Sequence, residues 1–282
     1  MDKLEFEIKE KINLKELLKS KNISTRAYKK IINNLVYVND EKISKNIGLK
    51  AGDKVKILIE DENLNYEPIN KKIKILYEDK DIVAVDKPPN LTVNSKNQES
   101  LSNYLAYYFK ENKIKSQIRL INRLDMNTSG IMLVAKNPFS HAYYQNQIEN
   151  NELDKEYLAL VEGNLIIDDF CEIDIDYDKE NKKMKVVSDK NHVKTYFKTL
   201  KNYGKFSLIY CKIYTGKTHQ IRLSLAYLNH PILGDNLYGS KYDIERFLLH
   251  AYRIKFKSFR DQKKITILSK PDFDKYLNSK LF

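Results

Sequence analysis

The chain has 282 residues, and its 50 basic and 38 acidic side chains give a net charge of +12. With 42% hydrophobic residues it can bury a core, which excludes general disorder, and its length suits two domains. No apolar run approaches the roughly 18 residues that span a membrane, and the first residues, MDKLEFEIKEK, are too charged for a signal peptide. The chain has two cysteines, which excludes a disulfide framework and a Cys-based zinc site. We therefore expect a cytoplasmic protein.

Residues 1–62 predict a small α+β module. The segment 12–21 (INLKELLKSK) predicts a short amphipathic helix, and 24–34 (STRAYKKIINN) predicts a second helix that Ser24 or Thr25 caps. Strand signals follow at 35–40 and 53–60, joined through Gly48 and Gly52. Residues 63–72 are polar and contain Pro68, so we expect a linker there.

Residues 73–282 predict a larger domain. Strands are expected at 73–79, 81–89, 131–136, 156–163, 192–200, 206–215, 247–256 and 263–269. Helices are expected at 101–111, 138–150, 218–228 and 271–279. Because the helices interrupt the strands without βαβ regularity, the expected fold class is α+β with a mixed or antiparallel sheet.

The positive charge is concentrated in two blocks. Residues 11–59 have a net charge of +8 and 181–282 of +15, whereas 149–180 have −10. Such blocks favour a nucleic-acid partner, although a solvated lysine-rich surface explains the bulk composition equally well. Only 7 of the 50 basic residues are arginines, so we expect arginines preferentially where a planar, bidentate donor is needed.

The familiar catalytic motifs are absent from the sequence. The five histidines are scattered without metal-ligand spacing, and neither a glycine-rich phosphate loop nor a G-x-S-x-G nucleophile motif occurs. We therefore expect neither a metal nor another cofactor.

The segment INRLDMNTSG (121–130) places an arginine and a carboxylate two residues apart. If the backbone is extended, the side chains of Arg123 and Asp125 point the same way. Thr128 and Ser129 can bond local backbone groups, and Gly130 is expected to let the chain reverse. Taken alone, this motif favours a structural Asp that closes a turn beside a surface Arg over a catalytic one.

A second segment, TGKTHQIRLSLAYLNHPILGDNLYG (215–239), holds three of the eight glycines. Thr218 is the expected N-cap of its helix. Arg222 is offset from the apolar helix face, so its side chain can reach inward beside a site.

Together these segments carry the motifs of one known family. R-L-D-x-x-T-S-G is present at 123–130, K-x-Y-x-A-x-V-x-G at 155–163, P-I-x-G-D-x-x-Y-G at 231–239 and L-H-A at 249–251, and 215–222 is close to T-G-R-x-H-Q-I-R. In motif order and spacing, 73–282 resembles the RluA-type pseudouridine synthases, which implies the pseudouridine synthase fold. With V-x-V-N at 36–39 and G-D-x-V at 52–55, residues 1–62 resemble the ribosomal-protein S-four-type RNA-binding domain.

The resemblance implies roles for the matched residues. Asp125 matches the catalytic Asp that attacks or stabilises the ribose while the glycosidic bond of a uridine breaks, after which the freed uracil turns and rejoins the sugar through carbon 5. Tyr157 matches the Tyr that stacks on the uracil, with removal of the carbon-5 proton as an additional role. Arg222 matches the partner of the carboxylate, and Arg123 the side chain that enters the duplex when the base is flipped. Supporting positions are Thr128, His219 and Gln220.

The chain departs from the family pattern at several positions that leave the Asp, the Tyr and the Arg in place. These are Asn34, Val93-Asn94-Ser95, Asn122, Lys217 and Leu223-Ser224. We expect them to affect which RNA is bound rather than the chemistry.

The resulting prediction is an isomerase that converts uridines of ribosomal RNA to pseudouridine, with transfer RNA as the alternative substrate and a monomer as the default state. Two other functions stay open: a non-catalytic RNA-binding or ribosome-assembly factor, and an N-glycosidase that liberates uracil.

Overall fold

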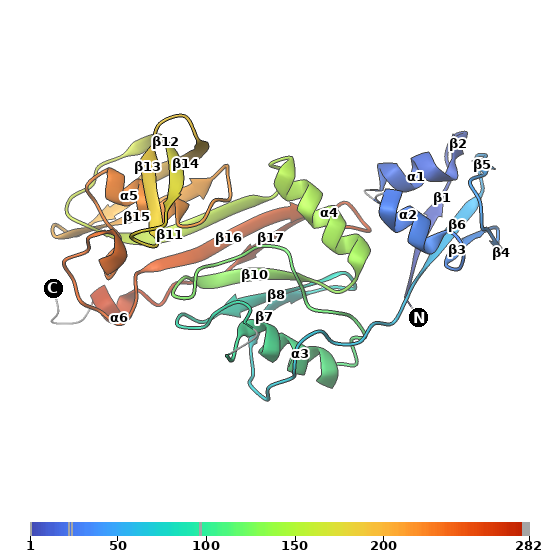
Figure 1. The fold of residues 1–282 in the computed structure, drawn as a ribbon, viewed down its shortest axis with the longest axis horizontal. Helices are drawn as coiled ribbons and strands as arrows, with labels where there is room; N and C mark the ends of the chain where they lie inside the picture. The colour runs from blue at the N-terminus through green and yellow to red at the C-terminus, as the bar shows by residue number, and fades with distance from the viewer. Residues whose placement is uncertain (1, 22, 24, 96–97, 278–282) are drawn as a thin grey trace.

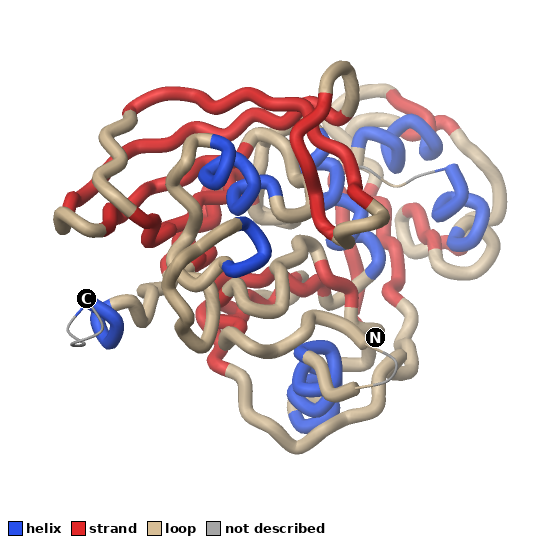
Figure 2. Tube along the Cα trace, turned by 60° about the vertical axis from the view of Figure 1, so that its left-hand side comes forward, coloured by secondary structure: helices blue, strands red, loops and turns tan. Residues whose placement is uncertain are grey.

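The computed structural model describes residues 2–21, 23, 25–95 and 98–277 (Figure 1). Ser24, one of the two expected caps, and residues 278–279, the end of the last expected helix, lie outside these ranges. The two ends of the described chain lie far apart (Figure 1, Figure 2). Within the described residues, no helix is both long and apolar enough to cross a membrane.

The N-terminal part of the chain folds into a small sheet covered by two helices. Its four described strands run in the order β1 (Asp2–Glu7), β6 (Lys54–Ile59), β3 (Val36–Val38), β4 (Glu41–Lys42), and all pairs are antiparallel. The helices α1 (Leu14–Ser20) and α2 (Thr25–Ile31) contribute buried leucines and isoleucines to the same core, and β2 (Ile12–Asn13) pairs separately with β5 (Gly48–Leu49). The two expected strands therefore pair as predicted, whereas β1 was missed because charged residues dominate its sequence.

A second sheet spans most of the remaining residues. In the described chain its strands follow the order β13-β12-β14-β15-β11-β16-β10-β8-β7, with β17 paired to β16 and β9 to β10. Only β10 and β16 run parallel among the described pairs, so the sheet is mixed, as expected. The strands are β7 (Lys74–Glu78), β8 (Ile82–Lys87), β9 (Arg119–Leu120), β10 (Ser129–Ala135), β11 (Asp154–Glu162), β12 (Asp168–Asp178), β13 (Lys183–Val187), β14 (Asn191–Asn202), β15 (Phe206–Ile213), β16 (Leu249–Lys257) and β17 (Lys264–Leu268).

Two helices cover opposite faces of this sheet (Figure 1). Along β10 the side chains alternate between the faces. Met132 and Val134 pack in the cluster of α3 (Leu101–Glu111), whereas Ile131 and Leu133 pack in that of α4 (Pro138–Glu149). Because both faces are covered, β10 is buried throughout and apolar after Ser129, and its first residues are held rigidly beside the site described next. A short α6 (Asp274–Leu277) follows β17.

An arginine of the large unit binds the small sheet. The Arg260 guanidinium bonds Asp81 of its own unit at 2.9 Å and Asp2 of β1 at 2.5 Å, and Arg119 bonds Glu62 of the connecting segment at 2.7 Å. The two units also share one apolar cluster. Residues 61–73, which connect them, contain no helix or strand. The domain boundaries at 62 and 73 stay a prediction.

The expected secondary structure was wrong by omission between residues 168 and 187, where no strand was predicted. The segment forms β12 and β13, which pair with each other. In β12 the side chains of Cys171, Ile173 and Ile175 are buried and alternate with exposed or partly exposed acidic side chains. This period of two is a strand signal, and the charge count concealed it.

Candidate active site

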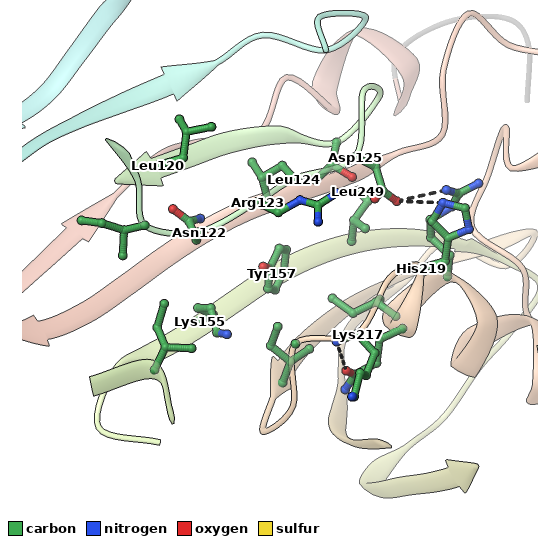
Figure 3. Close-up of a pocket in the computed structure, with 18 of the residues that line it drawn as sticks. Leu120, Asn122, Arg123, Leu124, Asp125, Lys155, Tyr157, Lys217, His219 and Leu249 are labelled. Atoms are coloured by element: carbon green, nitrogen blue, oxygen red, sulfur yellow. Dashed lines mark hydrogen bonds and ion pairs between the residues drawn. The ribbon is translucent and has the colours of Figure 1, made fainter. Parts of the chain in front are cut away.

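A cavity of about 310 Å³ opens beside the parallel pair β10–β16 (Figure 3). Residues 120–125 and Thr128 line one side, β11 forms its floor, and residues 216–222 close the opposite side. All seven site residues expected from the sequence, which include Arg123, Tyr157 and Gln220, line this cavity.

Asp125 lies in a tight turn before β10. The Thr128 backbone N–H donates to the Asp125 carbonyl oxygen at 3.1 Å, which closes the turn. The Asp125 side chain is 29% exposed and extends into the cavity. Thr128 is buried against the cavity wall. The turn therefore presents a carboxylate at the rim of a rigid sheet.

Gly130 does not reverse the chain, contrary to expectation, because the turn ends before it. Gly130 belongs to β10 and pairs with Ala251 of β16. Its φ is +109°, and a Cβ atom there would lie 2.3 Å from the Ala251 carbonyl oxygen. A glycine is thus required for the close approach of the two parallel strands.

The Asp125 carboxylate is paired with Arg222 of α5 (Gln220–Tyr227). The Arg222 guanidinium donates to Asp125 Oδ2 at 3.0 Å and makes two bonds to the buried Asp235, at 2.7 and 2.8 Å. Its central carbon lies 4.2 Å from the ring centre of Phe247. Burial lowers the pKa of Arg222, but its bonds to Asp235 and the two carboxylate charges outweigh this and raise it. Asp235 and the ring of Phe247 hold the guanidinium in place, so that an N–H group of Arg222 points at Asp125.

His219 also faces the Asp125 carboxylate (Figure 3). Its Nε2 lies 3.8 Å from Asp125 Oδ2, and its Nδ1 lies 2.9 Å from the Tyr238 hydroxyl. Burial and the nearby Arg222 charge lower the pKa of His219, so the ring is neutral at pH 7. The N-cap of α5 is His219 itself, in the left-handed conformation with φ 54°, and the expected cap at Thr218 is wrong.

Gln220 anchors the loop that leads into α5. Its carboxamide oxygen accepts from the Thr215 hydroxyl at 2.8 Å and from the Lys217 backbone N–H at 3.2 Å. Its amide nitrogen donates to Thr195 at 2.9 Å and to the Lys194 carbonyl at 3.1 Å. These bonds fix the approach of α5 to the sheet and do not touch Arg222.

Tyr157 and Arg123 face the cavity in different environments. Tyr157 is buried on β11, and burial together with the Asp125 charge raises the pKa of its hydroxyl, which stays protonated at neutral pH. Arg123 is exposed on the opposite wall and makes no hydrogen bond or ion pair to the described part of the chain. The site therefore combines a paired carboxylate, an aromatic ring and an uncommitted arginine.

Two buried residues that were not predicted from the sequence support this arrangement. The Lys87 ammonium is fully buried and donates to the carbonyl oxygens of Met126, Pro88 and Leu91 at 2.7–2.8 Å, which ties the Asp125 turn to the end of β8. The second is Asp235, the partner of Arg222. Lys87 precedes two prolines in DKPP, which was its only signal, whereas Asp235 is the Asp of the P-I-x-G-D-x-x-Y-G motif, to which no role was assigned.

Asn122, a departure from the family pattern, has a structural place. Its side chain accepts from the Leu133 backbone N–H at 2.8 Å and donates to the Ile131 carbonyl at 3.2 Å. Both polar ends are thus occupied by β10. Within the described residues, no cluster of three His, Cys, Asp or Glu side chains is arranged to hold a metal ion.

The chain matches known proteins over most of its length. Residues 81–227 match the sequence profile of a family described as RNA pseudouridylate synthase. An uncharacterized RNA pseudouridine synthase of Helicobacter pylori is 32% identical over 89% of this chain and 82% of its own. Ribosomal large subunit pseudouridine synthase C of Buchnera aphidicola is 32% identical over 93% of this chain and 90% of its own.

A solved structure shares the fold. Human RNA pseudouridylate synthase domain containing 1 superimposes with a TM-score of 0.63 at 23% identity, over 73% of this chain and 87% of that one. The expected fold class, α+β with a large mixed sheet, is thereby confirmed.

Proposed function

The chain belongs to the RNA pseudouridylate synthase family, and we propose that it isomerises specific uridines of ribosomal RNA to pseudouridine with Asp125 as its catalytic carboxylate. The observation that carries this assignment is the Asp125 carboxylate, oriented by Arg222 at the mouth of a cavity whose floor is the Tyr157 ring.

The carboxylate suits the first half of the reaction. When the bond between ribose C1′ and uracil N1 breaks, both electrons leave with the uracil and positive charge develops on the sugar. A fixed carboxylate beside C1′ stabilises that charge or attacks the carbon. Because Arg222 is held by Asp235, the Asp125 oxygen needs no reorganisation as the charge appears.

The second half of the reaction needs the uracil to be retained. The ring turns, a bond forms between C1′ and C5, the C5 proton leaves and N1 gains a proton, so atoms and electrons balance without a redox partner. We assign Tyr157 the stacking role, because its raised pKa keeps the hydroxyl protonated and disfavours it as the acceptor of the C5 proton.

Access to a paired uridine requires base flipping, which costs a few kcal/mol. Arg123 is exposed, lines the cavity and has no hydrogen-bond or ion-pair partner in the described chain. We therefore propose that its side chain fills the space that the flipped base leaves in the duplex. The choice of ribosomal RNA follows the name of the Buchnera relative, and the small N-terminal unit is proposed as an RNA-binding domain.

The test uses ribosomal RNA transcripts carrying tritium at uridine carbon 5. Wild-type protein should release tritium, and Asp125→Asn should abolish release while RNA binding persists. Asp261→Asn removes a carboxylate that is 65% exposed outside the cavity and should release tritium like the wild type.

Two results would overturn the proposal. Folded wild-type protein that releases no tritium from ribosomal or transfer RNA would support a non-catalytic RNA-binding factor. Free uracil and abasic RNA among the products, instead of RNA of unchanged mass, would indicate an N-glycosidase.

A further inference from the structure

Lys155 is a half-buried cation that lines the cavity and has no role in the function proposed above. Its ammonium lies against the backbone of Gly216, where a Cβ atom would be 3.5 Å away. Within the described residues it makes no hydrogen bond or ion pair, unlike its strand neighbour Asp154, which pairs with Lys212 at 2.7 Å. Burial alone lowers the pKa of Lys155. A desolvated amine without a partner is poised to donate to a ligand.

The position of Lys155 along the cavity is set by β11. Lys155 and Tyr157 are two residues apart and both line the cavity, whereas Glu156 between them points away and pairs with Arg253 and Lys255. Lys155 and Asp125 lie on opposite sides of Tyr157 (Figure 3). The Asp125 charge contributes to the raised pKa of the Tyr157 hydroxyl, in agreement with their closeness.

Apolar side chains contribute to the cavity wall, and one of them, Ile213 of β15, pairs directly with Lys155. A flat base that stacks on Tyr157 with its sugar at Asp125 would direct its far edge toward Lys155, because Lys155 and Asp125 lie on opposite sides of Tyr157 (Figure 3). In this pose the RNA phosphates, which are attached to the sugar, lie on the Asp125 side of the cavity.

From this geometry we propose that Lys155 binds the uracil carbonyl oxygen that lies opposite the glycosidic bond, and so retains the base while it turns. The inference rests on the proposed function and specifies how that site holds its substrate.

The symmetry of uracil makes one donor sufficient for the whole reaction. Before cleavage, the carbonyl opposite the bond to ribose is C4=O4. A half-turn about the N3–C6 axis exchanges N1 with C5 and O4 with O2, so the carbonyl opposite the new bond is C2=O2. Lys155 therefore meets an oxygen acceptor in substrate and product, and in between it stabilises the negative charge that the detached uracil carries.

The same contact discriminates against cytosine. Cytosine presents an amino group at position 4, and an ammonium facing an amino group leaves a buried donor without an acceptor. Lys155 is thus a specificity-determining residue as well as a retaining one.

The test compares wild-type protein with Lys155→Met, which keeps the length and packing of the side chain and removes the amine. Ribosomal RNA transcripts are made with uridine or with 4-thiouridine, and the isomerised nucleoside is quantified by liquid chromatography. With uridine, Lys155→Met should lose about 10- to 100-fold in kcat/KM, the range of a charge-assisted hydrogen bond. With 4-thiouridine the loss should be several-fold smaller, because sulfur is a weak acceptor.

Three further measurements exclude other roles. The midpoint of thermal unfolding should stay at the wild-type value, Lys155→Arg should recover part of the activity, and the salt dependence of RNA binding should be unchanged. Lys263→Met, at an exposed lysine outside the cavity, is the matched control and should react like the wild type.

The outcomes separate the two proposals. Wild-type activity in Lys155→Met, an equal loss with both transcripts, or a salt slope reduced by about one, which indicates a phosphate ligand, would each refute the role of Lys155 and leave the proposed function intact. A wild-type protein that isomerises neither transcript would overturn the proposed function, and the inference with it.

Discussion

Replacement of Asp235 by Asn tests how the site orients its carboxylate. Arg222 is 7% exposed and makes three charged hydrogen bonds, of which two go to Asp235 and one to Asp125. Asp235 is 1% exposed, and among the described residues Arg222 is the cation that pairs with it. The Asp235→Asn variant keeps the volume and one acceptor oxygen but removes the charge.

The magnitude follows from what remains around Arg222. Removal of one partner from a buried ion pair costs about 3–5 kcal/mol. Here Asn retains one hydrogen bond and Asp125 stays as a second carboxylate, so we expect the free energy of unfolding to fall by about 2–4 kcal/mol. Asp125 is 29% exposed and accepts a single bond from Arg222, so Asp125→Asn should cost less than about 1 kcal/mol.

Urea denaturation and tritium release measure the two consequences separately. Both variants should be catalytically impaired, Asp235→Asn by about 100-fold through misplacement of Arg222, but only Asp235→Asn should be markedly destabilised. A fully active or fully stable Asp235→Asn protein, or an Asp125→Asn protein that is the less stable of the two, would refute this account of the ion pairs.

Two other predictions concern a titrating group and a backbone contact. The pKa of His219 is lowered from 6.5 in the folded protein, so the unfolded chain binds a proton more readily, and the free energy of unfolding should decline as the pH falls below about 6.5. His219→Gln should remove that part of the decline. An unchanged pH profile of unfolding in this variant would contradict the prediction. Gly130→Ala forces a methyl group to 2.3 Å from the Ala251 carbonyl oxygen and should lower the free energy of unfolding by more than about 2 kcal/mol. Gly48→Ala, where a Cβ meets nothing within 4 Å, is the control, and equal stabilities of the two variants would refute the requirement for glycine.

The sequence predicted the parts of the molecule whose signal is local. All eight strands expected in 73–282 are present, and α3 begins and ends at the predicted residues because its apolar spacing and flanking polar residues are clear. The strand β12 escaped because its exposed acidic side chains dominated the composition. The alternation of apolar and acidic residues along this segment nevertheless predicts a strand.

The site divides in the same way. Asp125, Arg222 and Tyr157 were found through motifs and do line one cavity. Lys87 and Asp235 act through contacts with Met126 and Arg222, which lie 39 and 13 positions away in the sequence. Hydrophobic periodicity carries no information about such contacts. The role expected of Gly130 was wrong for a related reason, since only the pairing of β10 with β16 shows what the missing side chain makes room for.

The most direct test of the central claim is a pseudouridine map of ribosomal RNA from three strains, which carry the wild-type gene, the Asp125→Asn allele or a deletion. We predict one or more positions that are pseudouridine in the wild type and uridine in both other strains. Identical maps in the three strains, or full modification with the Asp125→Asn allele, would contradict the claim that this carboxylate isomerises uridines in ribosomal RNA.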